Sequence, residues 1–169
     1  PPAVWEAMEH CIKYAGANPG RSGHRMALEA GRLIDEAREL LAALFNINNP
    51  ERIVFTLNAT ESLNLAIKGQ LKKGQHVITS SMEHNAVARP LFVMEQRGVE
   101  VTKVPCDKDG SINIKDIEAA IKPNTAAVII THASNVTGTL MPIAEIGQLT
   151  KKKGLIFIVD AAQTAGVYD

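Results

Sequence analysis

The sequence predicts an α/β fold, a three-layer αβα sandwich built around a mostly parallel β-sheet. From residue 52 onward, strand-like apolar runs alternate with segments of helical periodicity, which is typical of crossover units and a parallel sheet. The runs Val128-Ile-Ile130 and Ile156-Phe-Ile-Val159 are apolar throughout. Such runs are expected of strands that are covered by helices on both faces.

The first part of the chain predicts two helices joined by a loop. Val4, Met8 and Ile12 share one face of a helix over residues 3–14, and the prolines before it are tolerated at a helix start. Three glycines and a proline between residues 16 and 24 predict the loop. Residues 25–46 carry leucines at helical spacing on one side and charges on the other, which predicts an amphipathic helix.

The rest of the chain predicts alternating strands and helices without internal repeats or an interdomain linker. Strands are expected where short apolar runs occur, and helices where apolar residues recur every three or four positions. The expected strands are residues 52–57, 76–80, 99–104, 126–131 and 155–159, and the expected helices are residues 61–71, 85–97, 114–121 and 143–152.

Composition excludes several classes of protein. The chain has 169 residues, 18 Lys plus Arg, 18 Asp plus Glu and a net charge of +0, which argues against a nucleic-acid partner. No apolar run approaches the roughly 18 residues of a membrane span, so no membrane partner is expected. Two cysteines are too few for a disulfide scaffold and suit a cytoplasmic location. The histidines and cysteines lack paired metal-ligand spacing, so no metal site is predicted.

Polar turns follow four of the expected strands. Because ligands of such sheets bind beyond the carboxyl ends of the strands, these turns are expected to form one site. They are the segments 58–62, 82–85, 132–138 and 160–163.

The turn that begins at Asn58 allows two interpretations. Ala59 and Thr60 would open a helix, whose unpaired N–H groups and positive dipole end bind phosphate well. The alternative is a capping box, with Asn58 as the cap and Glu61 three residues later. A Walker loop is excluded because no Gly-Lys-Ser/Thr string is present.

The other turns carry one candidate functional group each. Asp160 directly follows an apolar strand, so its carboxylate is expected to meet a cation, such as a protonated ring nitrogen, or to cap the next helix. His84 is either an acid/base and stacking group or a surface residue. Asn135 and Gln163 are hydrogen-bond donors to a ring oxygen or ordinary turn residues. His132 is expected as a hydrogen-bonded core histidine rather than a ligand.

Taken together, four strings resemble the class V aminotransferase family of fold type I pyridoxal-phosphate enzymes. The resemblance is closest to its cysteine desulfurase and selenocysteine lyase branch. The strings are Phe55-Thr-Leu-Asn-Ala-Thr-Glu-Ser62, Glu83-His-Asn-Ala86, Ser134-Asn-Val-Thr-Gly138 and Val159-Asp-Ala-Ala-Gln163. They occur in the family's order over nearly the whole chain, and a histidine at position 84 resembles the desulfurase branch rather than true aminotransferases.

The resemblance implies pyridoxal 5'-phosphate as the cofactor and a role for each matching residue. Ala59 and Thr60 would hold the cofactor phosphate. His84 would stack on the ring and move protons, which makes it the candidate catalytic residue. Asp160 would pair with the pyridine nitrogen, Gln163 would contact the ring oxygen, and Asn135 would bind near the ring hydroxyl or the substrate carboxylate.

The resemblance also implies that residues 1–169 are part of a pyridoxal-phosphate-binding large domain. The family's N-terminal segment, its Schiff-base lysine and its C-terminal small domain are expected outside this chain. Neither Cys11 nor Cys106 is expected to replace the family's catalytic cysteine. Arg21 or His24 would reach a cofactor phosphate or a partner chain, or else lie in a solvent loop.

Two hypotheses of function follow, one for the full-length protein and one for this chain alone. The full-length protein would be a homodimeric enzyme that releases sulfur from a small, cysteine-like amino acid. The alternative is a class V aminotransferase of other specificity. The chain by itself would be an inactive cofactor-binding scaffold, because it lacks the Schiff-base lysine. A Rossmann-type module lacks support because no Gly-x-Gly-x-x-Gly string occurs.

Overall fold

The computed structural model describes residues 1–20 and 23–168, which form two compact units, Pro1–Phe55 and Thr56–Asp169. The first unit contains α1 (Pro2–Tyr14), α2 (Arg25–Leu44) and the short 3₁₀ helix η1 (Pro50–Arg52). The two predicted helices are confirmed, although α2 ends two residues earlier than expected. None of the residues of α1 is buried. No helix among the described residues is long and apolar enough to cross a membrane.

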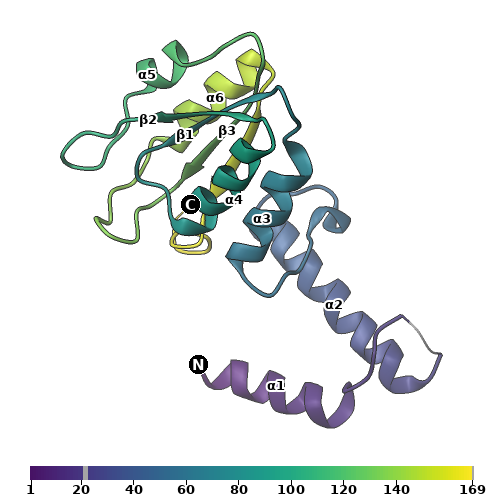
Figure 1. Ribbon diagram of the computed structural model, residues 1–169. Helices are drawn as coiled ribbons and strands as arrows, with labels where there is room; N and C mark the ends of the chain where they lie inside the picture. Colours follow the sequence, from purple (N-terminus) through teal and green to yellow (C-terminus); the bar gives the residue numbers. More distant parts are fainter. Residues whose placement is uncertain (21–22, 169) are drawn as a thin grey trace. The chain divides into compact units, whose positions relative to one another are not determined.

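The second unit contains a four-stranded sheet and four helices (Figure 1). All three strand pairs are parallel, and the strand order is β2-β1-β3-β4. The α/β prediction with a mostly parallel sheet is thereby confirmed. The elements are α3 (Ala59–Gln70), β1 (His76–Ser80), α4 (Asn85–Gln96), β2 (Glu100–Val104), α5 (Ile114–Ala119), β3 (Thr125–Thr131), α6 (Ile143–Lys153) and β4 (Ile156–Asp160).

The strand expected at residues 52–57 is wrong. Pro50 and the Asn49 side chain, which accepts a hydrogen bond from the Glu51 N–H, start η1 instead. The following residues pair with no strand among the described residues, and Val54 and Leu57 are 67% and 90% exposed. An apolar run favours an extended backbone, but a strand also requires a neighbour, which the run does not specify.

Two apolar cores cover the two faces of the sheet, because successive side chains of a strand point to opposite faces. Val77 and Ile129 face α3 and α4, whereas Ile78 and Ile130 face α5 and α6. All four side chains are 0% exposed. The three-layer sandwich follows from this alternation.

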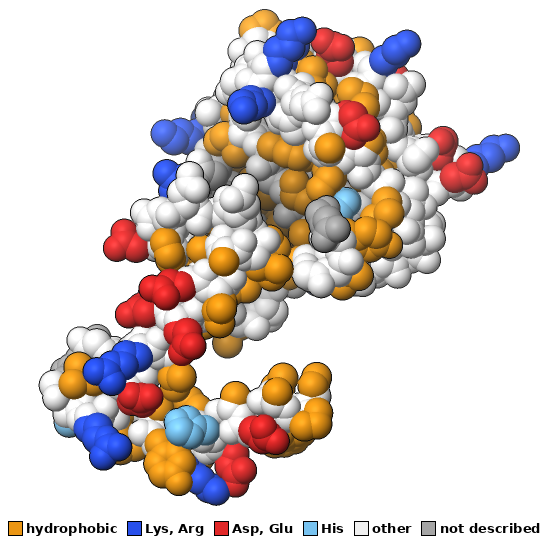
Figure 2. Space-filling view, turned by 180° about the vertical axis from the view of Figure 1, so that it is seen from behind, with side chains coloured by type: hydrophobic (Ala, Val, Ile, Leu, Met, Phe, Trp, Pro, Cys, Tyr) orange, Lys and Arg blue, Asp and Glu red, His pale blue; other side chains and the backbone are white. Residues whose placement is uncertain are grey.

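Figure 2 shows acidic and basic side chains interspersed over the face it presents, with hydrophobic side chains grouped between them.

The central strand β1 begins with a fully buried histidine. The ring nitrogens of His76 lie 2.7 Å from the Thr125 Oγ1 and 2.8 Å from the Thr102 Oγ1. The histidine at the start of β1 thereby contacts the middle of β2 and the first residue of β3. Burial, and then the nearby Lys122 charge, lower the pKa of His76.

Candidate functional site

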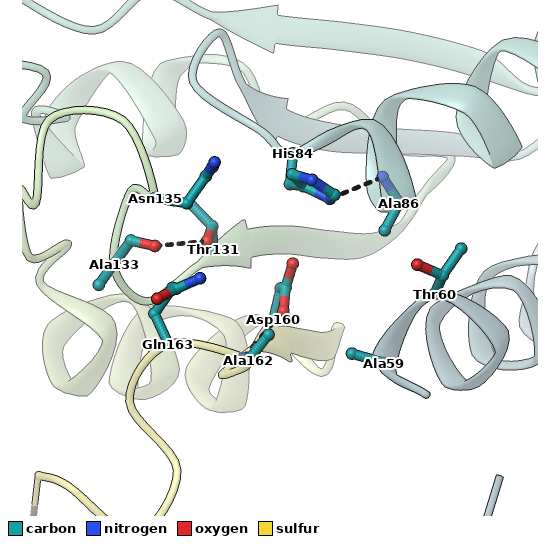
Figure 3. A pocket seen from close by; sticks show the side chains of 10 residues that line it. All are labelled: Ala59, Thr60, His84, Ala86, Thr131, Ala133, Asn135, Asp160, Ala162 and Gln163. Carbon is teal, nitrogen blue, oxygen red and sulfur yellow. Dashed lines mark hydrogen bonds between the residues drawn. The ribbon is translucent and has the colours of Figure 1, made fainter. Parts of the chain in front are cut away.

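A pocket lies at the carboxyl edge of the sheet, on the side of α3 and α4 (Figure 3). The chain passes from β1 to β2 on one side and then returns to β3 on the other, so the direction of winding reverses between β1 and β3. Ligands of open α/β sheets bind at such a reversal. The pocket is lined by Ala59, Thr60, His84, Ala86, Thr131, Ala133, Asn135, Asp160, Ala162 and Gln163.

All six residues that the sequence analysis singled out line this one pocket. They come from the start of α3, the turn before α4, the segment after β3, and the end of β4 with the turn that follows it. Sequence positions more than 100 residues apart are thus brought together, as the placement of polar turns at one sheet edge predicted. Their individual roles remain predictions.

The start of α3 has the predicted capping box and also leaves amides open to the pocket. The Glu61 N–H donates to the Asn58 Oδ1 at 3.0 Å, and the Glu61 Oε2 accepts from the Leu57 N–H at 2.7 Å. The capping interpretation is therefore confirmed. It does not occupy the N–H groups of Ala59 and Thr60, which have no partner within the helix because they belong to its first turn. The same turn can hold an anion.

Asp160 is the last residue of β4 and is only 6% exposed. Its Oδ1 accepts the Ala162 N–H at 3.1 Å, which is a local cap of the turn that follows. Its other carboxylate oxygen accepts no hydrogen bond from the described part of the chain. Figure 3 shows the carboxylate pointing into the space between His84, Thr60 and Gln163. A poorly solvated carboxylate with a free oxygen is a strong acceptor for a cationic N–H group.

His84 is the N-cap of α4, and its Nδ1 accepts the Ala86 N–H at 3.1 Å. This bond fixes the orientation of an otherwise exposed ring beside the pocket. In the neutral ring an accepting Nδ1 leaves the proton on Nε2. The ring therefore has one fixed nitrogen and one that is available to a ligand.

Asn135 and Gln163 are exposed, but buried hydroxyl groups hold the turns that carry them. The Ser134 Oγ accepts the N–H groups of Val136 and Thr137, both at 3.2 Å. The Thr164 Oγ1 lies 2.8 Å from the His132 Nδ1. His132 is thus hydrogen-bonded, as expected, and does not line the pocket.

Glu83, which is partly buried beside the pocket, has no role in the sequence prediction. Its Oε1 accepts the Ser80 hydroxyl at 2.6 Å and the Thr131 N–H at 3.1 Å. Burial raises the pKa of Glu83 to about 7, and the charge of Asp160 adds to the rise, whereas hydrogen bonds from Ser80 and Thr131 oppose it. Thr131 was also missed, although its place at the end of an expected strand was a signal for the pocket edge.

One alternative for the first loop is that Arg21 or His24 reaches the site. Arg21 lies outside the described residues. The His24 Nδ1 accepts the Ala27 N–H at 3.3 Å and caps α2 in the other unit. Cys11 is exposed on α1 and Cys106 is partly buried after β2, and neither lines the pocket.

The donor set around the pocket fits a ligand with an anionic end and a protonated ring nitrogen. Ala59 and Thr60, at the start of α3, lie on one side of the pocket, and the Asp160 carboxylate lies in the middle (Figure 3). Among the described residues that line the pocket, no lysine and no cysteine occurs.

Comparison with known proteins gives consistent matches. The family described as aminotransferase class V matches residues 1–168. Cysteine desulfurase IscS of Vibrio atlanticus is 43% identical, and that of Proteus mirabilis is 42% identical. Each match covers 98% of this chain and 42% of the relative. The chain thus spans less than half the length of these curated relatives.

Solved structures give the same result. The apo structure of a cysteine desulfurase from Thermococcus onnurineus superposes with a TM-score of 0.91 at 34% identity, over 98% of this chain and 42% of that chain. The structure of SspA in complex with cysteine has a TM-score of 0.89 at 37% identity, over 97% of this chain and 48% of that chain.

Proposed function

Because the chain belongs to the class V aminotransferase family, we propose that the whole protein is a pyridoxal-phosphate-dependent cysteine desulfurase. In this proposal residues 1–169 supply much of its cofactor site. Cysteine desulfurases and class V aminotransferases are pyridoxal-phosphate enzymes in general. The substrate class is supported by relatives that are cysteine desulfurases and by a similar protein whose structure contains cysteine.

One observation carries the proposal: the pocket combines open helix amides with a nearly buried, half-satisfied carboxylate. Pyridoxal phosphate has a phosphate group at one end and a pyridine nitrogen in its ring. The N–H groups of Ala59 and Thr60 would bind the phosphate, with the positive end of the α3 dipole behind them. The free oxygen of Asp160 would accept the ring N–H and keep that nitrogen protonated.

The remaining pocket residues would orient the ligand. His84, fixed by its bond to the Ala86 N–H, would lie against the ring and move protons at its Nε2. Gln163 would donate to the ring oxygen, and Asn135 would bind near the ring hydroxyl or the substrate carboxylate. The bound cofactor supplies an electron sink for the substrate's bonding electrons.

Sulfur transfer would need groups that this pocket does not hold. A lysine that binds the cofactor and a thiol that accepts sulfur are absent from the described lining residues. We therefore propose that the chain alone binds pyridoxal phosphate without covalent attachment and does not turn over cysteine. We further propose that the whole protein is a cytoplasmic homodimer, where free thiols such as Cys11 and Cys106 persist.

The test is a calorimetric titration of the chain with pyridoxal phosphate. A charge-assisted hydrogen bond contributes about 1.5–3 kcal/mol, so Asp160→Ala is expected to weaken binding by roughly 10- to 100-fold. Asp116→Ala, which removes an exposed carboxylate on α5, is the matched control and should leave the affinity unchanged. Equal affinities of the Asp160→Ala variant and the unmodified chain would contradict the assignment of Asp160.

The substrate is tested on the whole protein. Release of sulfide or an enzyme persulfide from cysteine is the expected result. The match to the class V aminotransferase family favours one other candidate, an aminotransferase of different specificity. Formation of pyruvate or glutamate by amino-group transfer, without sulfide, would establish that candidate instead.

A further inference from the structure

Glu83 connects two strands at the point where the sheet opens into the pocket. It lies in the turn between β1 and α4, directly before His84. Its Oε1 accepts the hydroxyl of Ser80, the last residue of β1, at 2.6 Å. The same oxygen accepts the N–H of Thr131, the last residue of β3 and 48 positions away, at 3.1 Å.

The Thr131 amide lies just beyond the paired part of β1 and β3. The two strands pair as far as Thr79 and Ile129. On the other side of β3, the next amide, His132 N–H, donates to the Asp160 carbonyl, so the Thr131 N–H points toward β1. The ladder between β1 and β2 continues one residue further, because the Ser81 N–H donates to the Val104 carbonyl. The Glu83 carboxyl thus accepts an amide of β3 that lies just beyond the last residue pair of β1 and β3.

The turn that carries His84 is held at both ends by this arrangement. The Ser80 Oγ donates to Glu83 and also accepts the Met82 N–H at 3.1 Å. At the other end, His84 caps α4 through its Nδ1. The Glu83 carboxyl is therefore the link between this turn and β3, whose Thr131 lines the same pocket.

One carboxyl oxygen forms both bonds. The other, Oε2, is buried and has no hydrogen-bond partner among the described residues. Neither bond requires a negative charge. A neutral carbonyl oxygen can accept the same O–H and N–H groups in the same geometry as a carboxylate oxygen. A neutral amide of the same size would therefore make the same two bonds.

We propose that Glu83 is a positioning residue of the cofactor site: its carbonyl-type oxygen ties the His84 turn to the end of β3. It acts through His84 and Thr131 and does not itself line the pocket. Its effect on cofactor binding rests on the function proposed above, whereas its effect on the Thr131 amide does not.

The test compares three substitutions of Glu83. Glu83→Gln keeps an acceptor oxygen at the same reach, Glu83→Met keeps the length without a strong acceptor, and Glu83→Asp keeps the charge on a shorter side chain. Glu95→Met, on the exposed face of α4, controls for the loss of an acidic side chain. Hydrogen exchange of the Thr131 amide and the NMR shifts of the His84 ring report the positioning directly, and a titration with pyridoxal phosphate reports its consequence.

Loss of a buried hydrogen bond should speed exchange at Thr131 by about tenfold or more in the Met and Asp variants. These variants should also shift the His84 ring signals and weaken pyridoxal-phosphate binding. The Gln and Glu95→Met variants should resemble the unmodified chain in all three measurements. If Glu83→Met fails to fold, the comparison of Asp with Gln decides.

Two outcomes would overturn the proposal: unchanged exchange at Thr131 in the Met and Asp variants, or a Gln variant as impaired as these. Failure of the unmodified chain to bind pyridoxal phosphate would instead contradict the proposed cofactor site of this chain. The exchange and ring-shift comparison would still decide the role of Glu83, so the two failures are distinguishable.

Discussion

Glu83 makes the stability of the protein depend on pH. Its carboxyl has an ordinary pKa of 4.5, which burial raises to about 7 in the folded protein. The folded state therefore binds this proton more tightly than the unfolded state does. The stability that Glu83 contributes is complete below about pH 4.5 and decreases as the pH rises, until it levels off above about pH 7.

Glu83→Gln should remove this dependence. Urea unfolding of both proteins between pH 5 and pH 8 is expected to show a difference that grows with pH, in favour of the variant, to at most about 3 kcal/mol. The amide keeps the bonds to Ser80 and Thr131 but carries no charge. Parallel stability curves for the two proteins would show that the carboxyl does not titrate in this range.

His76 has the opposite effect on the pH dependence of stability. Because the unmodified protein and Glu83→Gln both contain His76, its contribution is the same in both and does not change the difference between them. Its pKa is lowered by burial and then by the Lys122 charge. Protons therefore favour the unfolded state, and stability decreases as the pH falls below the ordinary value of 6.5.

For single residues, the sequence predicted the site residues that follow the strands. It did not predict the side chains, such as that of Glu83, that hold these residues in place. Asp160 and His84 were recognisable because each comes directly after a strand or before a helix. Glu83 has the same kind of position, but its role depends on Thr131, which is 48 residues away. A partner that distant is set by strand register, and local spacing does not report register.

Among the elements, α3 depends on its capping residue. Asn58→Ala should remove the bond between the Asn58 Oδ1 and the Glu61 N–H and destabilise the protein by about 1 kcal/mol. Asn58→Asp keeps an acceptor at the same place and should cost much less. Thermal or urea unfolding measures both variants, and equal losses would show that the cap contributes little.

Most element positions could be predicted from the sequence. The strands β1 to β4 lie within one residue of their expected bounds, because each is a short run rich in β-branched residues between polar turns. The expected strand at residues 52–57 failed because its apolar residues have no strand beside them. Apolar periodicity indicates which residues share a face and does not tell what covers that face. The exposed apolar side chains of α1, such as Trp5 and Ile12, show the same limit.

At the scale of the whole molecule, the sheet unit contains its own core. Both apolar clusters consist of residues from Leu63 onward, and none comes from residues 1–55. A chain that begins at Thr56 is therefore expected to fold, with a sheet signal in circular dichroism and a cooperative urea transition.

A chain that begins at Lys72 is the control for this truncation. It also lacks α3, which contributes the buried side chains of Leu63 and Ile67. Loss of two such side chains removes several kcal/mol, so this shorter chain should not fold cooperatively. Loss of cooperativity in the chain from Thr56 as well would show that the first unit is required.

The position of β1 between β2 and β3 has a consequence for the order in which the sheet forms during synthesis. The central strand leaves the ribosome before either neighbour, since β2 pairs with it from Glu100 and β3 from Thr125. Its five residues are all buried in the finished sheet. The nascent chain must therefore keep this segment unpaired until both neighbours have emerged. This interval is one in which a protein of this topology is exposed to aggregation and benefits from chaperones.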